Sequence, residues 1–230
     1  MCTIFYSMKD IKIVPIFNQA APGIWTDFAR IESTAPNMSD VATSKYAYEW
    51  THYKQNFSFG AYDGADMVGF VRGHCGGMTS YVDGLFLLPD YRGQNIGLKL
   101  LRKAESIAAF NGRRIELISL GGAMGFYKHV GYRALPQVSS NRFEKILPAR
   151  RGGIDVLPVF STGRAFGRAS KHLENLPKIE PHQPAFMYVD IEGRIQGLIS
   201  DNATTVAQNG MAEYIKRQLV KNFENYKSMR

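Results

Sequence analysis

The chain has 230 residues, of which 45% are hydrophobic, and a net charge of +8. That composition excludes an intrinsically disordered chain, and no apolar run reaches the roughly 20 residues that cross a bilayer. Lys9, Asp10 and Lys12 interrupt the N-terminal apolar stretch, which argues against a signal peptide. Basic residues are spread along the whole chain, so we expect neither a nucleic acid nor a membrane as a partner. Two cysteines, Cys2 and Cys75, cannot form a disulfide framework, and the cytoplasm is the expected location.

The N-terminal part predicts a strand, then helices, then a hairpin. In chain order we expect a strand at 11–17, two helices within 21–53 joined by a turn at 36–40, hairpin strands at 57–62 and 67–72, a glycine-rich loop at 74–80 and a strand at 81–88. The hairpin is indicated by two apolar runs around the Gly/Asp turn at 63–66.

The middle of the chain predicts a helical crossover between two strands. Apolar residues fall on one face of a helix at 94–110, which ends at Asn111-Gly112. We then expect a strand at 114–120, a short helix at 123–130 and a closing strand at 141–147. The fold class is therefore α/β, with a mixed central sheet flanked by helices and at least one parallel crossover.

A boundary at Pro148–Gly153 divides the chain into predicted domains at 1–150 and 151–230. The second part predicts a helix near 166–176, a hairpin at 185–190 and 194–200, and a final helix. Its hairpin resembles the first one, with a glycine in the second strand of each, which indicates an internal repeat. The final helix has an apolar face that needs a partner, either the first domain or a second copy of the chain; its members are Met211, Tyr214, Ile215, Leu219, Phe223 and Tyr226.

The turn between the strand at 85–88 and the long helix is a candidate phosphate site. It delivers the backbone N–H groups of Arg92–Gly97 to the positive end of a helix, where phosphate binds without a particular side chain. Gly93 and Gly97 leave room for a ligand near the backbone. The dinucleotide and Walker glycine motifs are both absent. By itself, an ordinary turn explains the pattern equally well.

The string LPDYRGQNIGLKLL closely resembles motif A of the GNAT superfamily of N-acetyltransferases. Arg92 and Gly97 match the ends of that motif, and Asn95 stands where the family usually has its first glycine. The resemblance implies a GNAT fold and acetyl-coenzyme A as acyl donor, with no metal. The implied cofactor contacts, through the strand edge and the turn, are Phe86, Leu87, Leu88, Arg92, Gly93, Gln94, Asn95, Ile96, Gly97 and Leu98.

The segment Gly125–Tyr132 resembles GNAT motif B, in which an aromatic–Tyr pair precedes Gly-Phe or Gly-Tyr. The resemblance implies that Tyr127 is a general acid for the departing thiolate. The alternative interpretation is that Tyr127 is an aromatic residue of the core without a catalytic role. Many relatives have an asparagine where this chain has Leu120, so one cofactor contact is expected to be missing.

The residues that would act on the acceptor amine are less clearly indicated by the sequence. By the family pattern, the Leu87 N–H is the expected oxyanion donor. Asp83 is the candidate general base, with a turn carboxylate as the competing interpretation, and Glu49 and His74 are weaker candidates. No His/Asp pattern surrounds Cys75, so we do not expect a covalent intermediate.

Together these features predict an acetyl-coenzyme A-dependent N-acetyltransferase that acts directly on a primary amine of a small molecule or peptide. The alternatives are a catalytically silent sensor of acyl-coenzyme A with the same fold, or an interaction module that has lost the cofactor. The C-terminal part resembles a shortened second GNAT-like domain, and a loose motif match at Arg164–Ala169 is not expected to bind a second coenzyme A.

Overall fold

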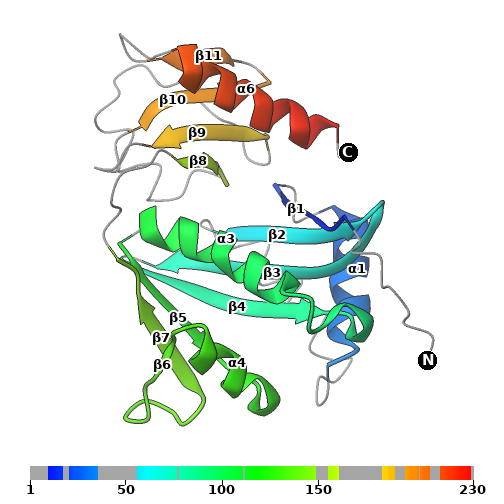
Figure 1. The fold of residues 1–230 in the computed structure, drawn as a ribbon, viewed down its shortest axis with the longest axis vertical. Helices are drawn as coiled ribbons and strands as arrows, with labels where there is room; N and C mark the ends of the chain where they lie inside the picture. The colour runs from blue at the N-terminus through cyan, green and yellow to red at the C-terminus, as the bar shows by residue number, and fades with distance from the viewer. Residues whose placement is uncertain are drawn as a thin grey trace, which may run out of the picture.

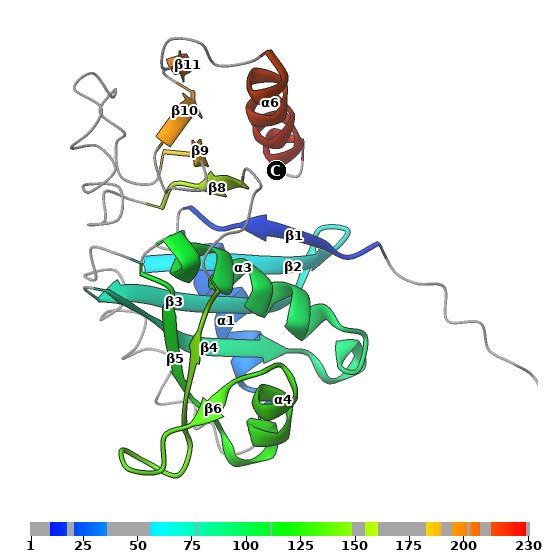
Figure 2. The same cartoon turned by 60° about the vertical axis from the view of Figure 1, so that its left-hand side comes forward.

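The computed structural model describes residues 10–17, 21–35, 56–76, 78–110, 112–148, 155–160, 183–189, 195–201, 203–207 and 213–228. These residues form a mixed seven-stranded sheet with helices on both faces and a separate four-stranded sheet with its own helix (Figures 1 and 2). The predicted second helix of the N-terminal part and the predicted helix near 166–176 lie outside the described residues.

The large sheet has the strand order β1-β2-β3-β4-β5-β7-β6. Its strands are β1 (Lys12–Pro15), β2 (Asn56–Asp63), β3 (Asp66–Gly76), β4 (Thr79–Leu87), β5 (Arg114–Ile118), β6 (Arg133–Ala134) and β7 (Arg142–Ile146). Its helices are α1 (Pro22–Glu32), α3 (Ile96–Phe110) and α4 (Met124–His129), with 3-10 turns at Pro89–Tyr91 and Gly121–Ala123. All neighbouring strands are antiparallel except β4 and β5, which are parallel and joined through α3 as predicted.

The two helical layers cover opposite faces of this sheet. The apolar face of α3, with Leu100, Leu101 and Ala104 fully buried, packs on the odd-numbered side chains of β2 and on β5. On the other face, Phe28 and Ile31 of α1 pack against Phe70 of β3. Alternating side chains along β3 therefore serve two separate apolar clusters, which explains its almost continuous burial.

The predicted glycine-rich loop at 74–80 is wrong, because β3 continues to Gly76 and β4 begins at Thr79. Gly76 is the last residue of β3, and Gly73, just ahead of the predicted loop, lies inside the same strand. A Cβ atom on Gly73 would lie 2.1 Å from the carbonyl oxygen of Tyr81 and 2.4 Å from the ring of Phe57. Gly73 therefore marks a close approach between strands rather than a turn.

The second sheet has the order β11-β10-β9-β8 and is antiparallel throughout. Its strands are β8 (Asp155–Pro158), β9 (Ala185–Val189), β10 (Ile195–Ser200) and β11 (Ala203–Ala207), followed by α6 (Glu213–Lys227). The hairpin β9–β10 was predicted, whereas the short strands β8 and β11 were not. The order of four antiparallel strands and a helix is the same as β1-β2-β3-β4 and α3 in the large sheet.

The final helix covers its own sheet. Leu219 and Phe223 of α6 are buried with Phe186 and Ile199 of β9 and β10. The predicted apolar face is correct in this part, but Tyr214 is exposed, and Met211 lies outside the described residues.

Aromatic rings connect the two sheets next to β1, beside which β8 lies in both views (Figures 1 and 2). The Phe160 ring centroid is 5.5 Å from that of Phe17 and 5.3 Å from that of Phe59. Phe17 also meets Tyr226 of α6 edge-on at 5.0 Å. The C-terminal unit thus packs at the β1 edge of the large sheet, at the far end of the sheet from β7 and β6.

Candidate functional site

Strand β4 has a backbone edge that β5 leaves uncovered. The parallel pairing runs only from Thr79–Arg114 to Val82–Leu117, although β4 continues to Leu87. Figure 1 shows the two strands diverging beyond this point. A V-shaped gap in the sheet therefore opens beside residues 83–87 of β4.

Successive residues of β4 direct their backbone N–H and C=O groups to opposite sides, either toward β3 or toward the gap. The Leu88 N–H donates to the Val68 carbonyl at 2.9 Å, so Phe86 and Leu88 direct their backbone groups toward β3. Alternation then turns the N–H and C=O of Leu85 and Leu87 the other way, toward the gap. The backbone groups of Leu87 accordingly face the gap, whereas those of Phe86 and Leu88, also predicted as cofactor contacts, face β3.

The turn after β4 has the conformation that phosphate binding requires. Gly93 has φ 75° and Asn95 has φ 60°, so both residues are left-handed. Asparagine is the non-glycine residue that most readily adopts this conformation, together with aspartate. The first helical hydrogen bond runs from Lys99 N–H to the Asn95 carbonyl at 3.0 Å, so the amides of residues 96–98 have no acceptor within the helix.

The backbone at Asn95 gives the first testable prediction. Asn95→Gly is expected to change the free energy of unfolding by less than about 0.5 kcal/mol, because glycine adopts the left-handed conformation freely. Asn95→Val is expected to lose about 1–2 kcal/mol, because a β-branched residue is strained there. Urea unfolding of the two variants measures the difference, and equal stabilities would contradict the left-handed assignment.

Two glycines allow α3 to start directly against β4. A Cβ atom on Gly97 would lie 3.3 Å from Leu87 Cδ1, and one on Gly69 would lie 2.3 Å from Leu87 Cδ2. The Leu87 side chain thus fills the space left by both glycines, and the strand edge is held close to the turn. The same requirement explains the glycine in the second strand of the first hairpin.

Side chains fix the turn from outside. Tyr91 Oη donates to Asp63 Oδ2 at 2.7 Å, which ties the turn to the β2–β3 hairpin. Arg92 Nε donates to the Leu87 carbonyl at 3.2 Å, across the edge that faces the gap. Gln94 Nε2 donates to the Asp90 carbonyl at 2.9 Å. Residues 92–95 are otherwise exposed, and a Cβ atom on Gly93 would meet nothing within 4 Å.

Tyr127 lies in α4 with its ring in the core. It is 6% exposed and packs against Phe126, Tyr132 and Phe143, with ring centroids 5.2, 5.8 and 6.1 Å away. Burial raises its pKa to about 12, because the phenolate loses its hydration. The phenol is therefore protonated at any pH at which the protein works. Leu120, just ahead of this segment, is 48% exposed.

The predicted base Asp83 is paired with a histidine. His74 Nδ1 and Asp83 Oδ2 are 2.7 Å apart, and the imidazole stacks on Tyr81 with a centroid distance of 4.9 Å and an angle of 23° between rings. The contact depends on a bulge: Arg72 pairs with Gly84 but Gly73 pairs with Val82, so Asp83 is the extra residue. A strict alternation would not have predicted this contact.

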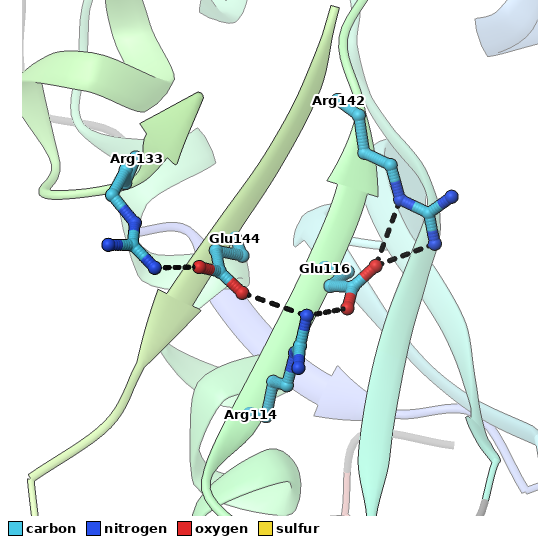
Figure 3. Close-up of polar contacts among 5 residues, drawn as sticks. All are labelled: Arg114, Glu116, Arg133, Arg142 and Glu144. Atoms are coloured by element: carbon cyan, nitrogen blue, oxygen red, sulfur yellow. Dashed lines mark hydrogen bonds and ion pairs between the residues drawn. The ribbon is translucent and has the colours of Figure 1, made fainter. Parts of the chain in front are cut away.

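A chain of charges continues from Tyr81 across the same face of the sheet (Figure 3). His74, Tyr81, Glu116, Glu144 and Arg133 are successive cross-strand partners. The two buried glutamates lie opposite each other, and arginines neutralise both. Arg142 Nη2 is 2.6 Å from Glu116 Oε2, Arg114 Nη2 is 2.8 Å from Glu116 Oε1 and 3.0 Å from Glu144 Oε2, and Arg133 also pairs with Glu144. These ion pairs, which no motif in the sequence indicated, join β5, β7 and β6 at the end of the sheet beside the gap.

A second buried pair joins α1 to β3 on the same face. Arg72 Nη2 is 2.9 Å from Glu32 Oε1, and the two residues are 5% and 1% exposed. Burial raises the pKa of Glu32, and the positive charge of Arg72 opposes that shift. The Arg72 Nε would lie 3.3 Å from a Cβ atom on Gly84, so the glycine lets the guanidinium lie next to the bulge.

Comparison with known proteins agrees with this geometry. Residues 54–134 match the family model of the acetyltransferase (GNAT) domain. This segment contains β2, β3, β4, α3, β5 and α4, and hence the gap, the turn and Tyr127. The resemblance noted in the sequence is therefore supported: this part of the chain is similar to an acetyltransferase (GNAT) domain. The family match ends before the predicted C-terminal extension.

Solved structures share the fold at low sequence identity. An acetyltransferase of the GNAT family from Staphylococcus aureus is 16% identical, with a TM-score of 0.52, over 60% of this chain and 99% of that one. GCN5 of Tetrahymena is 14% identical, with a TM-score of 0.51, over 61% of this chain and 98% of that one. The predicted α/β fold class is thus confirmed. No curated protein matches the chain.

None of the helices in the described part of the chain combines the length and the apolar character needed to cross a membrane.

Proposed function

We propose that this protein is an acetyl-coenzyme A-dependent N-acetyltransferase that transfers the acetyl group directly to a primary amine. The observation that carries the proposal is the backbone edge of Leu85 and Leu87, which faces a gap in the sheet and ends at a left-handed turn. A strand edge that pairs with amides and a helix start that binds phosphate together fit an elongated ligand with both features. Coenzyme A has a pyrophosphate and a pantetheine arm with two amides.

The residues at the site fit this donor. The amides of residues 93–98 would hold the pyrophosphate, with open space at Gly93. The Leu85 backbone and the Leu87 carbonyl, once Arg92 releases it, would pair with the pantetheine amides. The thioester would then lie between the Leu87 N–H and Tyr127. Among the residues predicted to bind the cofactor, Ile96 holds the helix in the core and acts through its backbone.

The chemistry needs three contributions from this chain. The Leu87 N–H stabilises the oxyanion that forms when the amine attacks the carbonyl. Tyr127 gives its proton to the sulfur as the C–S bond breaks. A group on the face of Asp83 takes a proton from the amine nitrogen. The proposed acceptor is a primary amine of a small molecule or a peptide.

We also propose that the C-terminal unit is a shortened copy of the first half of the fold. The repeated strand order and the helix that follows support this interpretation. The unit lacks a counterpart of β5 among its described strands, and β11 and α6 are joined by residues 208–212, fewer than the residues 88–95 that join β4 and α3. It is a support for the β1 edge rather than a second site for coenzyme A.

Binding of the donor can be tested by placing a charge in the turn. Gln94→Glu is expected to weaken the binding of acetyl-coenzyme A about five- to tenfold at low salt, because a carboxylate there repels the pyrophosphate. The matched control is Gln137→Glu, an exposed change away from the gap, which is expected to leave the affinity unchanged. Calorimetric titration measures both.

Turnover separates the remaining alternatives. Thiol release from acetyl-coenzyme A is measured with a panel of amines: lysine, spermidine, kanamycin and a short peptide with a free N-terminus. Turnover with any of them supports the enzyme. Tight binding of the donor without turnover on a wide panel would favour a sensor, and no binding at all would reject the proposal.

A further inference from the structure

The bulge in β4 brings together two side chains that the sequence treats as separate candidates. We propose that His74 and Asp83 act as a dyad in which His74 takes the proton of the acceptor amine and Asp83 positions the imidazole. The proposal rests on the proposed N-acetyltransferase function and deepens it, because it assigns the base of the same site. Asp83 then becomes a positioning residue instead of the base itself.

The contact defines the state of the imidazole. A carboxylate can only accept a hydrogen bond, so at the 2.7 Å contact His74 Nδ1 is the donor and Asp83 Oδ2 the acceptor. In a neutral imidazole this leaves Nε2 as the basic nitrogen. The imidazole of His74 stacks face to face on the Tyr81 ring, which fixes the plane of the imidazole. One carboxylate and one aromatic ring thus determine both the tautomer and the orientation.

The position of the dyad relative to the gap decides how it acts. Asp83 is the first residue of β4 beyond the last pair with β5, and the His74 and Asp83 side chains are 30% and 28% exposed. Asp83 and Leu87 are four residues apart, which is about 13 Å along a strand. The dyad therefore does not touch the acetyl carbonyl. It takes the proton from the acceptor through water, as a base next to the cleft can do.

The proton balance closes with the groups named. A protonated amine loses one proton to His74 through water and attacks the carbonyl carbon as the free amine. The C–N bond forms, the second nitrogen proton leaves for solvent, and the C–S bond breaks. The sulfur takes the phenolic proton of Tyr127, which is replaced from solvent. No oxidant, reductant or metal takes part.

Two charged residues on the same face of the sheet as His74, Arg72 and Glu116, form ion pairs with other residues. Arg72 is two residues away on the same strand face and is paired with Glu32. Glu116 lies beyond Tyr81 in the same cross-strand row and is paired with Arg114 and Arg142. Within the described part of the chain, the carboxylate of Asp83 is in direct contact with the imidazole, so its removal should act on His74.

The test is the pH dependence of kcat/KM with the best amine of the panel, from about pH 5 to about pH 8.5, the range in which imidazoles titrate. His74→Gln is expected to lower kcat/KM on the order of 10- to 100-fold and to remove the acidic limb of the profile. Asp83→Asn is expected to lower it less, because the imidazole keeps its basic nitrogen and loses only the carboxylate that orients it. His129→Gln, an exposed histidine on α4, is the control and should match the wild type.

The outcomes are distinguishable. An active wild type whose acidic limb is unchanged in His74→Gln would overturn the dyad and leave the proposed function standing. A wild type that turns over no amine would overturn both. Equal losses in His74→Gln and Asp83→Asn would show a structural contact and also reject the dyad. Unchanged affinity for acetyl-coenzyme A and unchanged melting temperature show that each variant is folded.

Discussion

Tyr127→Phe is expected to lower kcat about a hundredfold or more while the affinity for acetyl-coenzyme A stays within about twofold. The reason is the loss of the hydroxyl that would protonate the sulfur as the C–S bond breaks; burial raises the pKa of this phenol to about 12 and keeps it protonated. Such a phenol never loses its proton to solvent near neutral pH, so the proton is always in place. It is also a weak acid, so it gives the proton up only when negative charge develops on a sulfur beside it.

A neighbouring tyrosine is the matched control. Tyr132 is also buried, with its ring 5.8 Å from that of Tyr127, and burial also raises its pKa. Tyr132→Phe removes a hydroxyl from the same part of the core and is expected to leave kcat within about threefold of the wild type. Thiol-release kinetics measure both variants. Equal losses in the two would show that packing matters and not the proton, and an unchanged kcat in Tyr127→Phe would reject the general acid.

Arg72→Met is expected to lower the free energy of unfolding by about 3–5 kcal/mol. The change leaves the Glu32 carboxylate buried without its partner charge. One of its oxygens, Oε2, already has no hydrogen-bond partner in the part of the chain that the structure describes. The double variant Arg72→Met with Glu32→Leu removes both charges and is expected to recover to within about 1–2 kcal/mol of the wild type.

The pH dependence gives this prediction a sign. Burial raises the pKa of Glu32 above its unfolded value, and removal of Arg72 takes away the opposing influence. In Arg72→Met the folded state therefore binds more protons than the unfolded state between the two pKa values. The stability deficit should be smallest in acid and grow as the pH rises through the raised pKa. Urea unfolding at several pH values measures it, and a deficit that is the same at all pH values would contradict the assignment.

Much of the fold follows from the sequence because alternation and helical periodicity are strong along β2, β3, β4 and α3. The short strands β8 and β11 have too few residues for a pattern, and β6 has only two. The loop predicted at 74–80 was wrong because glycine is typical of turns, whereas Gly76 lies in β3, where a Cβ atom would come within 3.2 Å of the Tyr81 ring.

The candidate site divides in the same way. Local backbone chemistry at Gly93 and Asn95 can be read from residue type, and both positions are left-handed in the structure. Residue type does not predict which β4 residues direct their backbone groups toward β3. In the structure, Phe86 and Leu88 do so, and their amides therefore face away from the gap. The contact of His74 with Asp83 needs both a bulge and a neighbouring strand, which no spacing in the sequence encodes.

The register of β5 and β7 favours apolar packing over the pairing of opposite charges. Both strands have an Arg-x-Glu-x-Ile pattern, in Arg114–Ile118 and Arg142–Ile146, and a slip of two residues would set each glutamate directly opposite an arginine. The native register instead sets Glu116 opposite Glu144, and like charges in that position oppose pairing. The same register places Phe143 beside Leu117 and against Tyr127. The chain thus tolerates local frustration between two strands, relieved by three arginines, in the register that packs Phe143 against its proposed acid.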